Sequence, residues 1–198
     1  LLKSFKIKVY DEDTGYGLLR YVLIRKAEFT DEIMVVLVTA SPVFPSKRNF
    51  VEALRREHPE ITTVVQNVND RTDSLVLGSK YQVLWGKGYI VDRLCGCSFK
   101  ISPGSFYQVN PIQAQKLYEK AIELADLTGK ETVVDAYCGT GTIGMIAAKK
   151  AGKVFGVESN PDAVRDAVGN AKANDVKNIR LYREDAGHFL QSCAADNM

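Results

Sequence analysis

The sequence has few of the residues that build disulfide frameworks, metal sites or membrane spans. It holds four Cys and two His among 198 residues, too few and too scattered to favour a disulfide scaffold or a zinc site. No apolar run approaches the roughly 20 residues that cross a bilayer, and the first residues lack the features of a signal peptide. We therefore expect free thiols, no bound metal, no membrane contact and a cytoplasmic location.

Charge of one sign is also scarce. The formal net charge is +2, with 15 Lys and Arg against 12 Asp and Glu in residues 1–100, and 11 against 12 in residues 101–198. An excess this small does not by itself indicate a nucleic-acid partner. It makes the first half the weak favourite for any contact with a polyanion.

Residues 1–100 are expected to form a small α+β domain. The strands are predicted from alternating or β-branched-rich runs, at residues 5–10, 18–25, 33–39 and 61–68. Residues 47–57 predict a helix with Ser46 as its N-cap, and Gly86-Lys87-Gly88 predicts a hairpin turn between strands 81–85 and 89–94. Basic residues gather in two places, which form either an RNA-contacting surface or ordinary solvated faces: Lys47, Arg48, Arg55 and Arg56, and Lys80, Lys87 and Arg93.

Residues 101–198 predict a different architecture. Asn110-Pro111 suits the start of a helix that runs to about residue 127. Predicted strands at 132–136, 154–157 and 179–182 then alternate with predicted helices at about 142–151 and 161–173. Such alternation is typical of βαβ units and a parallel sheet. The expected fold class is therefore α/β, a partial Rossmann-like sheet preceded by the smaller α+β domain, with the boundary near residue 100.

A glycine-rich turn joins the first of these strands to its helix. Gly139 and Gly141 let the backbone approach a ligand closely, and Glu158 lies 19 residues after Gly139. A doubly wound sheet places a ribose-binding acid at this distance. With Gly144 the turn also satisfies the G-x-G-x-x-G dinucleotide pattern, so an NAD(P)-dependent oxidoreductase is an alternative. Asp135 argues against it, because dinucleotide folds normally keep an apolar residue there.

Two motifs together point to one family. The segment Ser105-Phe106-Tyr107-Gln108-Val109-Asn110 precedes the predicted helix, and Asp135-Ala136-Tyr137-Cys138-Gly139-Thr140-Gly141 follows it. This pair resembles the RNA uracil-5-methyltransferase family, whose members use S-adenosyl-L-methionine (SAM) in a class I methyltransferase domain. The resemblance implies methylation of uridine C5 in RNA, with ribosomal RNA (23S) favoured over tRNA. A non-catalytic RNA-binding module is a further alternative.

The resemblance also implies roles for individual residues. Glu158 would hold the ribose of the cofactor, and Asp185 would lie near the adenine. The remaining cofactor contacts implied by the motifs are Gln108, Asp135, Tyr137, Gly139, Gly141 and Thr142. Cys138 is interpreted as a packing residue, because the family's nucleophile lies elsewhere.

The chemistry of the family implies that further residues are needed. Uracil C5 becomes nucleophilic when a cysteine thiolate adds to C6, and a base later removes the C5 proton. In the family both groups follow a D-P-P-like loop, which is not found after Asp185. We therefore expect residues 101–198 to be the first part of a cofactor-binding domain, inactive alone. The strand Thr132-Val133-Val134 is then left with one open edge, and we expect self-association there, or cover by the tail Gln191–Met198.

Overall fold

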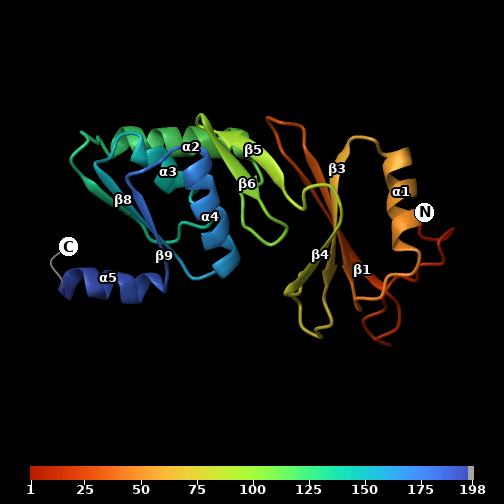
Figure 1. Cartoon of the computed structure of the whole chain (residues 1–198). Coiled ribbons are helices and arrows are strands. Elements are labelled where there is room, and N and C mark those ends of the chain that lie inside the picture. The colour runs from red at the N-terminus through yellow and green to blue at the C-terminus, as the bar shows by residue number, and fades with distance from the viewer. Residues whose placement is uncertain (196–198) are drawn as a thin grey trace. The chain divides into compact units, whose positions relative to one another are not determined.

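A computed structural model describes residues 1–195 of the chain (Figure 1). The chain forms two compact units, Leu1–Ile90 and Val91–Met198. This division lies ten residues before the expected boundary. The reason is a hairpin of β5 (Ile90–Leu94) and β6 (Cys97–Ile101), whose Leu94, Cys97 and Phe99 are part of the hydrophobic core of the second unit.

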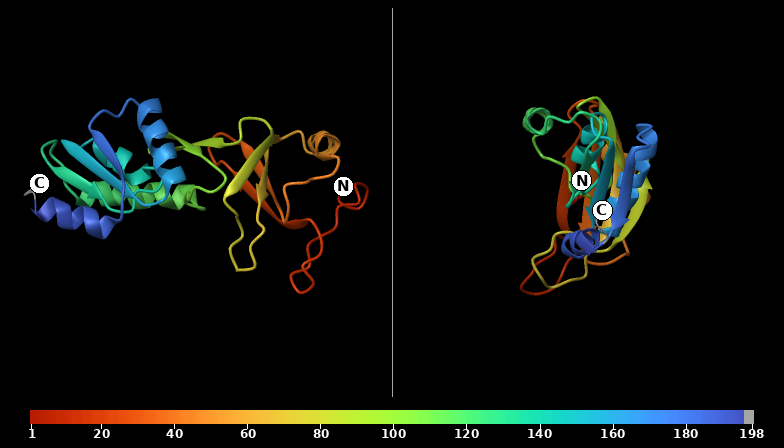
Figure 2. Two further views of the ribbon diagram at one scale, coloured as in Figure 1. Left: turned by 60° about the horizontal axis from the view of Figure 1, so that its bottom comes forward. Right: turned by 90° about the vertical axis from the view of Figure 1, so that its left-hand side faces the viewer.

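The first unit is a four-stranded sheet with one helix. Its strand order is β1-β2-β3-β4, and β2 and β3 run parallel while the other neighbours run antiparallel. The helix α1 connects β2 to β3 and lies against one face of the sheet (Figure 2). Its Phe50 and Val51 belong to the hydrophobic core of this unit. The elements are β1 (Leu19–Lys26), β2 (Ile33–Thr39), α1 (Lys47–Glu57), β3 (Ile61–Val68) and β4 (Lys80–Trp85).

Two sequence predictions for this unit are wrong. Residues 5–10 are no strand, since Phe5 and Ile7 donate backbone hydrogen bonds to Leu1 and Leu2 in a tight turn and only Val9 forms a bridge, to Leu19. The alternation that suggested a strand instead places Phe5 and Ile7 on the same hydrophobic core.

The predicted hairpin around Gly86 and Gly88 is the second error, because the flanking strands belong to different sheets. Thr63 on β3 accepts a hydrogen bond from the Gly88 amide at 2.8 Å and donates one to the Trp85 carbonyl at 2.8 Å, so β3 holds the turn. The N-cap position expected for Ser46 is confirmed, although this residue has a φ of 53° and its side chain makes no capping hydrogen bond.

The second unit contains the parallel sheet that the sequence predicted. Its order is β7-β8-β9, with β7 at one edge of the sheet among the described residues. Asn110 caps α2 by accepting a hydrogen bond from the Gln113 amide at 3.1 Å, with Pro111 as the first helical residue, as expected. The elements are α2 (Pro111–Leu124), β7 (Thr132–Asp135), α3 (Thr142–Ala148), β8 (Lys153–Glu158), α4 (Pro161–Ala173), β9 (Ile179–Arg183) and α5 (Ala186–Ala195).

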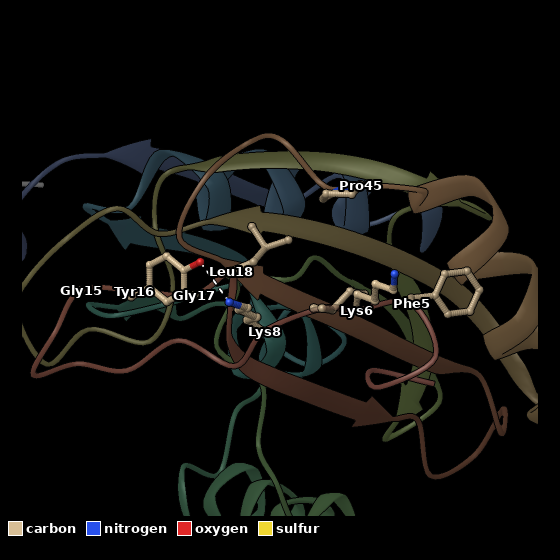
Figure 3. A pocket seen from close by; sticks show the side chains of 9 residues that line it. Phe5, Lys6, Lys8, Gly15, Tyr16, Gly17, Leu18 and Pro45 are labelled. Carbon is tan, nitrogen blue, oxygen red and sulfur yellow. Dashed lines mark hydrogen bonds between the residues drawn. The ribbon is translucent and has the colours of Figure 1, made fainter.

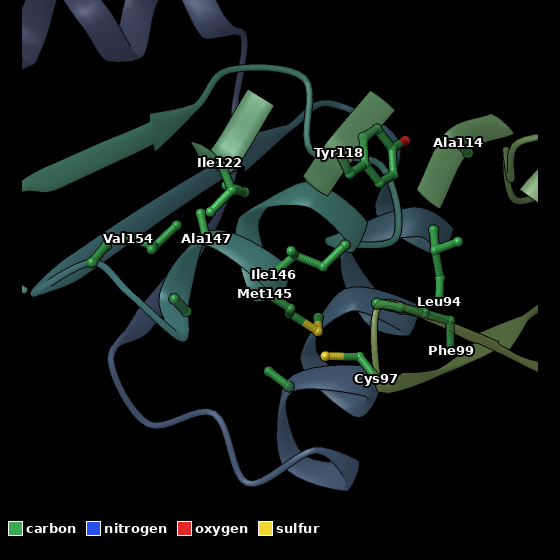
Figure 4. Packing of buried hydrophobic residues seen from close by; sticks show 13 residues of the cluster. Leu94, Cys97, Phe99, Ala114, Tyr118, Ile122, Met145, Ile146, Ala147 and Val154 are labelled. Carbon is green, nitrogen blue, oxygen red and sulfur yellow. The ribbon is translucent and has the colours of Figure 1, made fainter. Parts of the chain in front are cut away.

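Different helices cover the two faces of this sheet. On one face, side chains of α2, α3 and α4 join the β5–β6 hairpin around Met145 and Val154, both with no exposed surface (Figure 4). On the other face, Phe189 of α5 packs on Phe155 and Val157 of β8. The carboxyl ends of β7, β8 and β9 therefore lie side by side at one end of the sheet.

The free edge of β7 leads to a prediction about association. In the described part of the chain β7 pairs only with β8, and Val134 keeps 39% of its surface exposed. The described part of the tail forms α5 on β8, and residues 196–198 lie outside the described residues. An exposed apolar edge is a template for strand pairing, so we expect the 198-residue chain to dimerise and Val134→Lys to restore the monomer. Light scattering over a concentration series tests this, and a wild-type monomer at every concentration contradicts it.

Candidate functional site

The candidate site lies where three acidic residues follow three neighbouring strands. Asp135 ends β7, Glu158 ends β8, and Asp185 comes two residues after β9. Since the three strands are parallel neighbours, their carboxyl ends lie together at one end of the sheet. This carboxyl edge is distinct from the unpaired side of β7. Ligands of open α/β sheets bind at this edge, so the structure brings together three of the acids that the sequence singled out.

The glycine-rich turn is held by Glu158. The Glu158 carboxylate accepts a hydrogen bond from the Gly139 amide at 3.1 Å and another from the Asn160 amide at 2.7 Å. The Ser159 hydroxyl donates a third hydrogen bond to this carboxylate at 3.3 Å. A carboxylate has about four acceptor positions, so one remains free, and a second is occupied only by the rotatable Ser159 hydroxyl, which ligand hydroxyl groups can displace. Glu158 therefore both shapes the turn and keeps the capacity to bind a ribose.

The two glycines of the turn have different reasons to be glycine. Both have positive φ, 54° at Gly139 and 83° at Gly141, a region that disfavours other residues. A Cβ on Gly141 would come within 2.6 Å of the Met145 methyl group, whereas a Cβ on Gly139 would meet no atom within 4 Å. Gly141 thus permits close packing on α3, and the space above Gly139 is open for a ligand.

The surroundings of Asp135 disfavour the ionised form of its carboxyl group. Burial, together with the charge of Glu158, raises the pKa of Asp135 to about 6, against a lowering contribution from the Gly144 amide, which donates to Oδ2 at 3.0 Å. Perturbed carboxylates in an open site are typical of functional positions. A cationic group of a ligand near Asp135 would favour its ionised form.

The other expected site residues lie in varied surroundings. Asp185 is exposed, and its Oδ1 caps α5 by accepting hydrogen bonds from the amides of Gly187 and His188 at 2.9 and 3.1 Å. Thr142 is the half-buried first residue of α3, and Tyr137 is 83% exposed. Gln108 is half-buried between β6 and α2, and its side chain makes no hydrogen bond to other described residues.

Cys138 is buried in the turn and is no candidate nucleophile. Only 4% of its surface is exposed, and burial with the nearby charges of Asp135 and Glu158 raises the pKa of its thiol to about 12. A nucleophilic cysteine needs a lowered pKa. Burial also raises the pKa of Cys95, and the four cysteines are free thiols, as expected.

A row of polar side chains along α4 was not predicted from the sequence. Asp166, Asn170 and Asn174 follow one another at four-residue spacing, which places them on one face of the helix. Asp166 and Asn170 are 2% and 1% exposed. Asn170 accepts a hydrogen bond from the Lys100 amide of β6 at 2.7 Å and donates one to the Thr140 carbonyl at 3.1 Å. The four-residue spacing of these Asp and Asn residues, along a predicted helix and at its end, was the available signal.

Two cavities lie apart from Gly139 and Glu158. One, of about 350 Å³, is bounded by α2, β7 and α3, and touches Asp135 and Tyr137 but neither Gly139 nor Glu158. The other, of about 340 Å³, lies in the first unit, where Lys8 donates a hydrogen bond to the Tyr16 hydroxyl at 3.0 Å (Figure 3).

No helix among residues 1–195 is long and apolar enough to cross a membrane, and no three His, Cys, Asp or Glu side chains in that range gather as metal ligands would.

Similarity to known proteins agrees with the geometry of this edge. Residues 127–198 match the family model described as a methyltransferase domain. The chain is 43% identical over 181 residues to an uncharacterized RNA methyltransferase of Oceanobacillus iheyensis, covering 91% of this chain and 39% of that protein. It is 46% identical over 180 residues to one of Caldanaerobacter subterraneus, covering 91% and 40%. The chain thus spans about two fifths of the length of these relatives.

A solved structure supports the same fold. It is the tRNA (uracil-54, C5)-methyltransferase of Pyrococcus abyssi in complex with S-adenosyl-L-homocysteine (SAH), which is 29% identical. The TM-score is 0.75, and the match covers 91% of this chain and 43% of that one. The chain therefore has the Rossmann-like fold of the SAM-dependent class I methyltransferases, residues 127–198 match a methyltransferase domain, and the chain is similar to bacterial proteins named RNA methyltransferases.

Proposed function

We propose that the full-length protein containing this chain methylates uridine C5 in RNA with SAM as its cofactor. The observation that carries the proposal is the convergence of Asp135, Gly139 and Glu158 at one edge of the sheet. The motif around Gln108 supports the uridine specificity, as does the similarity to the solved tRNA (uracil-54, C5)-methyltransferase. The proposal includes the cytoplasmic location expected from the sequence.

The residues at this edge suit the groups of SAM. SAM supplies a methyl group on a sulfonium, a cationic centre that an ionised Asp135 would stabilise. Glu158 would accept hydrogen bonds from the ribose hydroxyls at the acceptor positions not used by the Gly139 and Asn160 amides, with the Ser159 hydroxyl turning away from the carboxylate. The remaining proposed cofactor contacts are Asp185 near the adenine, and Gln108, Tyr137, Gly141 and Thr142.

The oxidoreductase alternative is less well supported. An NAD(P) site places a pyrophosphate at the start of the helix after the glycines. In this chain the start of that helix, α3, already faces the Asp135 carboxylate, which accepts a hydrogen bond from the Gly144 amide in the first turn and whose ionised form is disfavoured. A second negative charge beside it would raise the electrostatic cost further. Calorimetry separates the alternatives, because we expect SAH to bind and NADH not to bind.

The RNA substrate is the first property to test. We expect the full-length protein to transfer labelled methyl groups from SAM to a 23S rRNA transcript and to leave a tRNA transcript unlabelled. The 198-residue chain should transfer none, because burial keeps Cys138 protonated. Digestion and chromatography identify 5-methyluridine. Its absence from both RNAs contradicts the uridine proposal, and labelling of tRNA alone keeps the chemistry but reverses the substrate.

We also propose that the first unit contacts RNA through the α1–β4 surface. Lys47 reaches β4 and donates to Gln82 at 3.1 Å, and the Arg55 guanidinium lies 3.6 Å from the Trp85 ring centroid. Arg48 and Arg56 are exposed on the same helix. The surface thus combines stacked and solvent-facing cations, which suits phosphate contacts.

Neutralising two exposed arginines tests this surface. Arg48→Ala with Arg56→Ala should weaken RNA binding across sequences and reduce the slope of log affinity against log salt by about 2. These residues are preferred to Arg55, whose loss would also remove its stacking on Trp85. The matched control neutralises Lys172 and Lys177 in the second unit. An unchanged slope in the arginine variant would mean that α1 is only a solvated face.

A further inference from the structure

The helix α4 joins the two motifs that carry the family resemblance. On one side, the buried Asp166 carboxylate accepts hydrogen bonds from the Ser105 hydroxyl at 2.7 Å and the Ser102 amide at 3.3 Å. Ser105 begins the segment that contains Gln108, and it has no exposed surface. Asp166 therefore fixes the start of this segment to α4.

On the other side, Asn170 holds the glycine-rich turn. Its side-chain amide donates to the Thr140 carbonyl, between the two glycines, at 3.1 Å and to the Lys100 carbonyl at 3.4 Å. Its oxygen accepts from the Lys100 amide at 2.7 Å. The Thr140 side chain is itself buried, and its hydroxyl has no hydrogen-bond partner among the described residues. The Asn170 side-chain amide thus holds the Thr140 carbonyl, and with it this part of the turn, in place.

Asn174, one helical turn further on, has the same chemistry without the connection to the site. It accepts from the Ser98 amide at 2.8 Å and donates to the Ser98 carbonyl at 2.7 Å. Both asparagines thus pair with a residue of β6, but only Asn170 also reaches Thr140. This difference separates a role in holding the hairpin from a role in holding the site.

We propose that Asp166 and Asn170 are positioning residues that set the spacing between the Gln108 segment and the Gly139–Gly141 turn, and thereby the affinity for the cofactor. The inference rests on the proposed SAM site and adds residues that do not touch the ligand. A displacement of about 1 Å in a supporting group is enough to lower binding or rate substantially. Hydrogen bonds made by buried polar groups resist such displacement, because breaking them leaves unpaired donors and acceptors.

Matched alanine variants of the full-length protein test the inference. Asn170→Ala should weaken SAH binding about tenfold, as expected for lost buried hydrogen bonds, and should speed amide exchange in peptides covering Gly139–Thr142. Asn174→Ala should lower the melting temperature to a similar degree and leave both the SAH affinity and this exchange unchanged. Ser105→Ala, a smaller change that leaves the ties of Asn170 to β6 intact, should weaken SAH binding about threefold.

The outcomes distinguish this inference from the proposed function. Equal effects of Asn170→Ala and Asn174→Ala on SAH affinity and exchange would overturn the positioning role. A wild-type protein that binds no SAH would contradict the cofactor proposal, while the exchange comparison would still decide whether Asn170 holds the turn. If Asn170→Ala does not fold, Ser105→Ala with wild-type SAH affinity would also overturn the inference.

Discussion

Glu158→Ala is expected to lower the affinity for SAH by about 30- to 900-fold, equivalent to about 2–4 kcal/mol. Part of the loss comes from the two ribose hydrogen bonds that the proposal assigns to the carboxylate. Another part comes from the turn, because the Gly139 and Asn160 amides lose the oxygens to which they donate at 3.1 and 2.7 Å. Isothermal titration of the full-length protein with SAH measures the change.

A neighbouring carboxylate provides the matched control. Glu184 follows β9 at the same edge of the sheet, is exposed, and meets Glu158 only through its backbone amide, which donates to the Glu158 carbonyl at 3.1 Å. Glu184→Ala removes the same charge from the same region, so it should leave SAH affinity within about twofold. Wild-type affinity in Glu158→Ala would remove Glu158 from the site, and equal losses in both variants would show a general effect of charge.

The parallel half of the fold could be predicted from the sequence because its signals are local. Asn110-Pro111 specifies a helix start through one side-chain cap and one fixed φ, and both occur as expected. The strand before Gly139 and the strand before Glu158 are short apolar runs between turn residues. Their parallel pairing then follows from the helix between them. Glu158 was expected at the carboxyl end of its strand by the same reasoning, whereas the places of Asp135 and Asp185 in the site were implied by the family resemblance.

The first unit was harder because its signals depend on partners distant in sequence. Tyr81–Trp85 and Tyr89–Leu94 have the composition of two hairpin strands, yet β4 pairs with β3 and β5 pairs with β6. The hydroxyl of Thr63 on β3 helps to hold this arrangement, since it forms hydrogen bonds with Trp85 and Gly88 at the two ends of the intervening turn. A contact across more than 20 residues has no local signature in the sequence.

The supporting residues of the site were missed for a related reason. Asn170 and Asp166 have the composition of an exposed helix face, and Asp and Asn are usually exposed. They are buried because β6 and the Gln108 segment cover them. A polar residue in a helix reveals its role only when its tertiary partner is known.

Asp135→Asn is expected to stabilise the protein without ligand and to weaken SAH binding. The pKa of Asp135 is raised from 3.8 to about 6, a shift worth about 3 kcal/mol. The folded state therefore holds a proton that the unfolded state has released between pH 4 and 6, so this group lowers stability as pH rises through that window. Above pH 6 the penalty is constant. Since an amide also loses hydration on burial, we expect a gain of about 1–3 kcal/mol at pH 7.5 and almost none at pH 4.

Glu131, which precedes β7, is a control of opposite sign. Hydrogen bonds from the Thr128 hydroxyl and nearby amides lower the pKa of Glu131 to about 2. Its ionised form therefore stabilises the folded state at neutral pH, and this contribution is lost as pH falls through the lowered pKa. Glu131→Gln should destabilise the protein at pH 7.5, opposite to Asp135→Asn. Urea unfolding at pH 4, 5, 6 and 7.5 measures both differences.

The stability and the SAH affinity of Asp135→Asn together test whether this carboxylate serves the cofactor at a cost to stability. If Asp135 serves the cofactor, Asp135→Asn gains stability and loses about tenfold or more in SAH affinity, since the amide cannot supply the charge that favours a cationic ligand group. Such an exchange of stability for binding is expected at a functional site. A variant that is less stable at pH 7.5 would mean that the carboxylate has a compensating partner in the fold. A more stable variant with unchanged SAH affinity would place the cofactor's cationic groups away from β7.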